Sequence, residues 1–352
     1  MSKYWSELAK RLEPYVPGEQ PKDKKYIKLN TNENPYPPSP KVLEAIRKAS
    51  NDDLRLYPDP DCDLLREAAS DYYGLKKEQI FAGNGSDELL AFAFAAFFDN
   101  GNPVFFPDIT YTFYEVYCNF FNITPKLIPL DENFNVPVDE FLKPNGGIVL
   151  ANPNAPTGKY LDLSAIRKIL EHNTERAVII DEAYIDFGGE SAISLINMYP
   201  NLMIMHTLSK SRSLAGLRVG FALGSEEMIE GIKRVKNSFN SYTVDRIAMA
   251  AASEAMKDRE YFDKTRNMVI QTREKTTEKL IKMGFNVLPS KANFIFVSHP
   301  VYQGAQLYRE LRNKGILVRY FNKPRIDNFL RITIGTDEDM NALINALDNI
   351  IN

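Results

Sequence analysis

Ala177-Val-Ile-Ile-Asp-Glu-Ala-Tyr184 and Met203-Ile-Met-His-Thr-Leu-Ser-Lys210 share one design, a short apolar run followed at once by chemically active side chains. Continuous apolar runs of this length are typical of strands that are covered on both faces. In an open α/β sheet, ligands bind beyond the carboxyl ends of the strands. We therefore expect Asp181 and Lys210 to face one cavity at the edge of a mostly parallel sheet.

Similar apolar runs occur on both sides of these two stretches and alternate with amphipathic segments such as Leu163–His172. This alternation predicts an α/β fold with a mostly parallel sheet in a large domain. The further runs of the large domain are Val104–Phe106, Ile148–Leu150 and Gly220–Leu223. Two long stretches with helical periodicity follow, Glu226–Asn237 and Asp245–Met283. The last seventy residues hold four more strand candidates, which predict a smaller C-terminal α/β domain: Phe285–Leu288, Phe294–Val297, Ile316–Tyr320 and Phe329–Ile334.

The first forty residues are rich in proline, asparagine and charge and end in Leu29-Asn-Thr-Asn-Glu-Asn-Pro-Tyr-Pro-Pro-Ser-Pro40. Five prolines between Pro14 and Pro37 exclude a long helix there, so we expect an extended arm laid over another surface. The predicted organisation is an arm over residues 1–40 that packs with the small domain, a large domain over 41–240, a connecting helix over 241–270 and a small domain over 271–352.

Composition argues against several classes of protein. A formal net charge of -3 gives no electrostatic basis for binding nucleic acid. The longest apolar run, Leu89–Phe98, is far shorter than the roughly 20 residues of a membrane span. Residues Met1–Glu7 lack the apolar core of a signal peptide. The two cysteines, Cys62 and Cys118, form neither a disulfide framework nor a metal-ligand spacing. We expect a cytoplasmic protein with no metal.

A candidate phosphate site precedes the apolar helix. Gly83-Asn-Gly-Ser-Asp-Glu88 places glycines at the helix start, where backbone N–H groups and the positive end of the helix dipole attract anions. Ser86 is the expected N-cap. Taken alone, the pattern is more typical of an ordinary capped helix. Arg218, eight residues after Lys210, suits bidentate contact with a phosphate, and Thr207 and Ser209 can add hydroxyls.

Together these residues match what pyridoxal 5'-phosphate (PLP) requires of a protein: an amine, a carboxylate against the pyridine nitrogen, a phosphate cradle and an aromatic face. Lys210 supplies the amine for a Schiff base and Asp181 supplies the carboxylate. Tyr111, within Ile109-Thr-Tyr-Thr-Phe-Tyr114, is the stacking candidate, although it is nearly as well explained as a core aromatic. The four features occur in order at strand ends, so the sequence predicts a PLP-dependent enzyme.

With these features, the sequence resembles the fold-type I PLP-dependent aminotransferases and, within them, the histidinol-phosphate aminotransferases. The resemblance covers nearly the whole chain. It is carried by Leu29-Asn-Thr-Asn-Glu-Asn-Pro35, Tyr57-Pro-Asp59, Gly85-Ser-Asp-Glu88, Thr110-Tyr-Thr-Phe-Tyr114, Asn152-Pro-Asn-Ala-Pro-Thr-Gly158, Asp181-Glu-Ala-Tyr-Ile-Asp-Phe187, Thr207-Leu-Ser-Lys-Ser211, Leu214-Ala-Gly-Leu-Arg-Val-Gly-Phe221 and Leu330-Arg-Ile-Thr-Ile-Gly-Thr336.

The resemblance implies a role for each matching position. Lys210 is the Schiff-base lysine and Asp181 the pyridine partner, while Tyr184 bonds the phenolic oxygen of PLP. Phosphate-binding positions are Ser86, Asp87, Ser209 and Arg218. Tyr57 reaches the phosphate in the neighbouring subunit, which implies a homodimer. The substrate-binding positions are Tyr15, Asn34, Arg319 and Arg331, of which Arg331 matches the arginine that binds the substrate's anion.

The sequence departs from the family at one position. The family usually has asparagine directly before Pro-Thr-Gly, donating to the phenolic oxygen of PLP, and here that residue is Ala155. Alanine cannot donate. Asn154 is one position earlier and is the candidate replacement, with Tyr184 sharing the task; the alternative is that Asn154 is a turn residue.

The implied reaction moves an amino group from L-histidinol phosphate to 2-oxoglutarate, giving imidazole acetol phosphate and glutamate, a step of histidine biosynthesis. Lys210, once displaced by the substrate amine, acts as the general base, and the pKa of Asp181 is expected to fall beside the pyridinium. Alternatives on the same scaffold are an aromatic-amino-acid aminotransferase and a decarboxylase of a phospho-amino acid. A non-catalytic nucleotide-binding module is more remote, because Gly83–Glu88 has neither G-x-G-x-x-G nor P-loop spacing.

Overall fold

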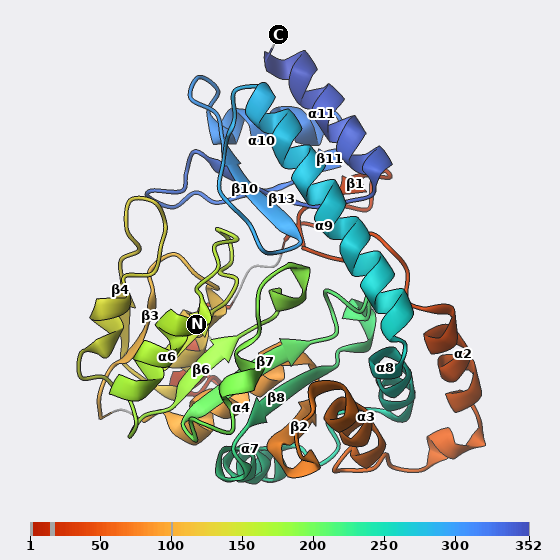
Figure 1. Ribbon diagram of the computed structural model, residues 1–352, viewed down its shortest axis with the longest axis vertical. Helices are drawn as coiled ribbons and strands as arrows, with labels where there is room; N and C mark the ends of the chain where they lie inside the picture. Colours follow the sequence, from red (N-terminus) through yellow and green to blue (C-terminus); the bar gives the residue numbers. More distant parts are fainter. Residues whose placement is uncertain (1–2, 15–17, 100, 352) are drawn as a thin grey trace.

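The computed structural model describes residues 3–14, 18–99 and 101–351, and the chain forms two bodies joined by the long helix α9 (Arg259–Lys282) (Figure 1). The larger body, in the lower half of the view, is built on a seven-stranded sheet. The smaller body, above it, carries a four-stranded sheet and the C-terminus. Among the described residues, no helix combines the length and apolar character needed to cross a membrane.

The large sheet has the strand order β2-β8-β7-β6-β5-β3-β4. Its five strands from β4 to β7 run parallel, and β8 runs antiparallel to both of its neighbours. The predicted mostly parallel sheet is therefore confirmed. Two of its strands were not predicted: β2, which pairs antiparallel with β8, and β4, an edge strand with three exposed residues. The strands are β2 (Ile80–Gly83), β3 (Val104–Pro107), β4 (Pro125–Ile128), β5 (Ile148–Ala151), β6 (Val178–Asp181), β7 (Leu202–Thr207) and β8 (Gly220–Gly224).

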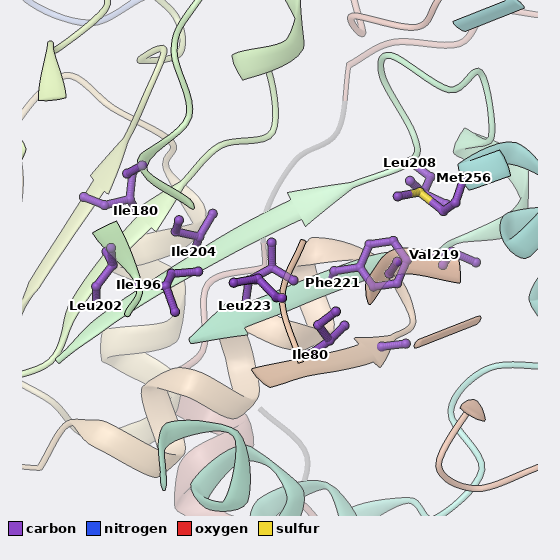
Figure 2. Close-up of a cluster of buried hydrophobic side chains, with 14 of the residues drawn as sticks. Ile80, Ile180, Ile196, Leu202, Ile204, Leu208, Val219, Phe221, Leu223 and Met256 are labelled. Atoms are coloured by element: carbon purple, nitrogen blue, oxygen red, sulfur yellow. The ribbon is translucent and has the colours of Figure 1, made fainter. Parts of the chain in front are cut away.

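Helices cover both faces of this sheet, which explains why its strands are continuously apolar. Along β6, Ile180 packs into one core and Ile179 into the other, because neighbouring side chains in a strand point to opposite faces. Figure 2 shows part of the first core, which includes Ile80 of β2, Ile204 of β7 and Phe221 of β8. The first core includes residues of α3 (Asp63–Tyr73), α6 (Leu163–His172) and α8 (Arg246–Lys257). The second includes residues of α4 (Gly85–Phe97), α5 (Phe113–Phe121) and α7 (Glu226–Phe239).

The small sheet is antiparallel, with the order β12-β13-β10-β9. The predicted strand Ile316–Tyr320 is divided, since its first two residues pair with the N-terminal arm and its last two join the small sheet. The arm therefore lies along the small body. The elements are β1 (Ile27–Lys28), β9 (Asn286–Val287), β10 (Phe294–Ser298), β11 (Ile316–Leu317), β12 (Arg319–Tyr320), β13 (Phe329–Thr333), α10 (Gly304–Asn313) and α11 (Asp337–Ile351).

The stretch predicted as one helix, Asp245–Met283, is broken at Asp258 into α8 and α9. The Asp258 carboxylate accepts hydrogen bonds from the Ser39 hydroxyl and the Lys41 amine, and so fixes the break against the start of α2. Helix α8 packs in the large body, whereas α9 crosses to the small one (Figure 1). The domain boundaries given above remain a prediction. The remaining helical segments are α1 (Glu7–Arg11), α2 (Pro40–Ala49) and the short 3-10 turns Asp52–Arg55, Lys77–Gln79, Val138–Leu142, Ile185–Phe187, Ala192–Leu195 and Ala215–Leu217.

Candidate active site

A cavity of about 940 Å³ lies at the carboxyl edge of the parallel strands and is lined from both bodies and the arm. The last residues of three neighbouring strands, Ala151, Asp181 and Thr207, line it, as expected for an open α/β sheet. The sequence-predicted residues that line it are Ser86, Asp87, Tyr111, Asp181, Tyr184, Thr207, Ser209, Lys210, Arg218, Arg319 and Arg331.

Lys210 reaches this cavity because β7 runs parallel to β6 and ends three residues before it. Its amine donates a hydrogen bond to the Thr31 carbonyl oxygen, at 3.3 Å, and lies 5.8 Å from the centre of the Tyr184 ring. The Lys210 side chain is therefore held between the arm on one side and the turn after β6 on the other. The amine predicted to form the Schiff base and the predicted pyridine partner, Asp181, are in one cavity.

Asp181 is a buried carboxylate at the floor of the cavity, only 5% exposed. Its Oδ2 accepts a hydrogen bond from the Tyr114 hydroxyl at 2.9 Å, and its Oδ1 accepts one from the Ala183 N–H at 3.2 Å. Burial raises the pKa of Asp181 to about 6, and the Tyr114 hydrogen bond offsets this only in part. A carboxylate in this setting favours a cation against it, which a protonated pyridine nitrogen would supply. The expected fall in its pKa concerns that loaded site and remains a prediction.

The first turn of α4 and Arg218 form an anion cradle. The Arg218 guanidinium donates to Asp87 Oδ2 at 3.1 Å and lies against Gly85, where a β-carbon would be 2.7 Å from Arg218 Nη2. Ser86 and Ser209 line the same cavity as Arg218. Guanidinium, hydroxyls and the N–H groups of a helix start are the donors that a phosphate prefers.

Ser86 is not the N-cap of α4, so that prediction was wrong. Helix α4 begins at Gly85, one residue before Ser86. The φ of Gly85 is 77°, which suits a residue without a side chain. The cap is Asn84, and its backbone N–H donates to the Glu88 carboxylate at 2.7 Å. The Ser86 hydroxyl is therefore not used to cap the helix and is available to the cavity.

These residues fit PLP by their chemistry: an amine, a buried carboxylate, an anion cradle and an aromatic ring share one cavity. The ring is Tyr111, whose hydroxyl donates to Asp87 Oδ1 at 2.9 Å. That bond anchors Tyr111 to the cradle.

Asn154 does not line the cavity, so the geometry speaks against its predicted role as a cofactor ligand. Its amide nitrogen donates to the Ile109 carbonyl oxygen at 2.9 Å and to Thr157 Oγ1 at 3.0 Å. Its amide oxygen accepts from Thr110 Oγ1 at 2.8 Å. Asn154 thus holds two loops together, as a turn residue does, and Ala155 faces the cavity in its place.

Asn34, which was predicted to bind substrate, does not line the cavity. Its amide donates to the carbonyl oxygens of Lys210 and Ser211, at 3.0 and 3.3 Å, and so secures the loop that carries Lys210. The asparagines of this segment that line the cavity are Asn30 and Asn32, and the sequence reasoning singled out neither of them. The segment was quoted for its family resemblance, but sequence spacing in an irregular arm does not tell which asparagine points inward.

The two substrate-side arginines enter the cavity from the small sheet. Arg331 donates to the Asn30 carbonyl oxygen at 2.9 Å, and its guanidinium lies 5.7 Å from the centre of the Phe321 ring. The Arg319 guanidinium lies 5.6 Å from the centre of the same Phe321 ring. Tyr15 falls outside the described residues. Tyr57 does not line this cavity, is 78% exposed and stacks on Tyr242 with ring centres 4.7 Å apart.

Comparisons with known proteins agree with this geometry. A family model described as aminotransferase class I and II matches residues 24–347. A histidinol-phosphate aminotransferase from Clostridium acetobutylicum is 58% identical over 351 residues, which cover 100% of both chains. One from Clostridium beijerinckii is 56% identical over 351 residues, covering 100% of this chain and 98% of the other.

The fold is similar to that of solved aminotransferases. The structure of histidinol-phosphate aminotransferase from Sinorhizobium meliloti, in complex with pyridoxal-5'-phosphate, matches with a TM-score of 0.88. The match covers 100% of this chain and 98% of that one at 24% identity, so it establishes the fold alone. The predicted fold, the PLP-dependent transferase fold type I, is confirmed by these matches.

Proposed function

The chain belongs to the class I and II aminotransferases, and we propose that it is a PLP-dependent enzyme that converts L-histidinol phosphate and 2-oxoglutarate to imidazole acetol phosphate and glutamate, in histidine biosynthesis. The observation that carries this proposal is 58% identity to a histidinol-phosphate aminotransferase over the full length of both chains. The cavity described above supplies the groups that such a reaction needs.

PLP, when bound, supplies an electron sink for the charge left on the substrate's α carbon. The Lys210 amine would anchor the cofactor and, when free, would act as the base that takes the proton from the substrate's α carbon. The Asp181 carboxylate holds a proton on the pyridine nitrogen. The hydrogen bond from Tyr114 fixes the carboxylate in place for that task.

The phosphate end of the cofactor is held by Arg218, by the Ser86 and Ser209 hydroxyls and by the N–H groups at the start of α4. Tyr184 would donate to the phenolic oxygen, a task that Ala155 cannot share because it has no donor. Tyr111 covers one face of the ring.

Arg331 and Arg319 recognise the anionic end of the substrate. Both line the cavity from the small sheet, opposite the cradle of the large body, so the substrate lies between the two bodies. Guanidinium groups suit both substrates, since histidinol phosphate carries a phosphate and 2-oxoglutarate carries carboxylates.

The active form is a homodimer in which Tyr57 reaches the phosphate of the partner's cofactor. Tyr57 is exposed and lies outside its own chain's cavity, which supports a role in a neighbouring site. We also propose that the enzyme works in the cytoplasm, in line with two buried cysteines that are both unpaired in the described chain.

An amino-donor screen tests the proposed reaction. Purified protein is incubated with 2-oxoglutarate and histidinol phosphate, phenylalanine or phosphothreonine, and glutamate and carbon dioxide are measured. We expect glutamate with histidinol phosphate. Turnover of phenylalanine alone would indicate an aromatic aminotransferase, and release of carbon dioxide a decarboxylase. Lys210→Ala is the control: it should abolish both turnover and the yellow absorbance of the bound cofactor, and retention of both would refute the role of Lys210.

A further inference from the structure

Asn32 makes a direct side-chain contact with Tyr184 across the boundary between the arm and the large body. Its amide nitrogen donates to the Tyr184 hydroxyl at 3.0 Å, and both side chains line the cavity. Asn32 is only 1% exposed and has a φ of 57°, a conformation that asparagine adopts more readily than most residues. The buried backbone thus holds the Asn32 side chain in one position, from which its amide donates a hydrogen bond to Tyr184.

Thr333 fixes which end of the Asn32 amide faces Tyr184. The Asn32 backbone N–H donates to Thr333 Oγ1 at 3.0 Å, so the threonine hydroxyl uses its own hydrogen to donate to Asn32 Oδ1, at 2.9 Å. Since the amide oxygen is thereby held by Thr333, the amide nitrogen must point at Tyr184. The Tyr184 oxygen accepts that bond, and its own hydrogen is directed away from Asn32.

This direction matters because the usual second donor is missing. Ala155 cannot donate, and the hydrogens of Asn154 are used by Ile109 and Thr157. The phenolic oxygen of the cofactor therefore depends on the Tyr184 hydroxyl, whose hydrogen must point into the cavity.

We infer that Asn32 is a positioning residue that orients the Tyr184 hydroxyl so that it donates to the cofactor's phenolic oxygen. The inference rests on the proposed function in so far as that function places PLP in this cavity. It assigns to the arm a task beyond its packing along the small body.

The same segment connects this task to the small body and to Lys210. The Asn293 side chain donates to the Asn32 carbonyl oxygen at 3.0 Å, and Asn34 donates to the Lys210 carbonyl oxygen at 3.0 Å. The arm thus bonds to the small body, to Tyr184 and to the Lys210 loop within three residues. Alignment of the Tyr184 hydroxyl requires the arm to lie between the two bodies.

The test is a spectroscopic pH titration of the holoenzyme without substrate. Asn32→Gly removes the amide, and glycine accepts the backbone conformation without strain. A phenolic oxygen with a weaker donor holds its proton to higher pH. We expect the midpoint of the cofactor's absorbance change to rise by about half a unit to one unit, the net worth of one hydrogen bond.

A double-mutant cycle separates positioning from general loosening. In a Tyr184→Phe background, Asn32→Gly should produce no further shift, because the group through which Asn32 acts is gone. Thr333→Val, which releases the amide oxygen, should shift the midpoint in the same direction by a smaller amount. It also provides the test if Asn32→Gly does not fold, as judged by thermal unfolding.

Asn293→Ala is the matched control, because it loosens the same backbone but leaves the Asn32 amide in place; its midpoint should stay at the wild-type value. An unchanged midpoint in Asn32→Gly, or an equal shift in the Tyr184→Phe background, would overturn the inference. Failure of the donor screen would affect the proposed substrate alone, whereas a protein that binds no PLP would overturn both proposals.

Discussion

At the scale of single residues, Asp181 shows how the site trades stability for function. Without its cation, the carboxylate is buried and has one hydroxyl and one backbone donor, so its charged form is disfavoured and its pKa rises to about 6. The pyridine nitrogen of the proposed cofactor, when protonated, would supply the missing counter-charge. A site built in this way is less stable empty than loaded.

Asp181→Asn should therefore stabilise the cofactor-free protein in a pH-dependent manner. The folded carboxyl has a pKa of about 6 and the unfolded one about 3.9, so between these values the folded state holds a proton that the unfolded state lacks. The wild-type free energy of unfolding thus falls as pH rises through this window and stays lower above it. Above pH 6 the variant should gain up to about 3 kcal/mol, and the gain should vanish near pH 4.

Urea unfolding of both cofactor-free proteins between pH 4 and 8 measures this difference. The same pair saturated with PLP is the control, because the wild-type carboxylate is then paired and the variant should be the less stable of the two. A difference that did not vary with pH would show that the Asp181 charge is not the cause.

At the scale of elements, the approach of β8 to the start of α4 shapes the anion cradle. Gly220 permits this approach, since a β-carbon there would lie 2.8 Å from the His206 carbonyl oxygen and 2.9 Å from the Ser86 nitrogen. Both neighbours are backbone atoms, which cannot turn aside as a side chain can. The contact thus sets the position of the Ser86 N–H relative to Arg218.

Gly220→Ala should push α4 away from β8 and weaken both stability and cofactor binding. Overpacking of this kind costs about 1–3 kcal/mol, and we expect PLP affinity to fall about tenfold or more. Thermal unfolding and a PLP titration followed by absorbance measure the two effects. Gly216→Ala is the matched control, because a β-carbon there meets no atom within 4 Å, and it should change neither quantity appreciably. Equal effects of both substitutions would argue against the steric explanation.

At the scale of the whole molecule, exposed apolar side chains lie around Tyr57, where the proposed homodimer would have its interface. Tyr57 and Tyr242 stack in a surface position, and Arg246 donates to the Tyr57 carbonyl oxygen at 3.3 Å, which holds the Tyr57 loop on α8. Large apolar residues that are exposed in the same two segments, 54–64 and 239–242, are Leu54, Leu56, Tyr57, Leu64, Phe239 and Tyr242. Exposure of this kind is typical of a surface that is covered in the assembled protein.

Co-expression of Tyr57→Ala and Lys210→Ala subunits should restore activity that neither variant shows alone. In a hybrid dimer, the intact Lys210 of one subunit meets the intact Tyr57 of the other, so one site is complete. Because half of randomly assorted dimers are hybrids with one such site, about a quarter of wild-type activity is expected. The activity of the unfractionated co-expressed protein provides the measurement, and hybrids purified with two different tags should show about half of the wild-type activity. If Tyr57 served its own subunit, hybrids would remain as inactive as the parent variants.

The sequence by itself determined the parts of this protein that depend on neighbours in the chain. The apolar runs Ala177–Ile180 and Met203–Met205 identified β6 and β7, and parallel pairing then requires that the side chains after them share a cavity. The glycine-rich start of α4 and Arg218, eight residues after Lys210, could be recognised in the sequence for the same reason. Each of these signals is local, because a strand end or a helix start is a matter of a few consecutive residues.

Only the tertiary structure decided which polar side chains face the cofactor cavity and which hold the fold together. Asn32, Asn34 and Asn154 are alike in sequence, yet one contacts Tyr184, one secures the Lys210 loop and one joins two turns. An asparagine follows whichever donors and acceptors surround it, and Tyr184 is 152 positions from Asn32 along the chain. Such contacts are set when the arm and the two bodies come together, so no local pattern of residues encodes them.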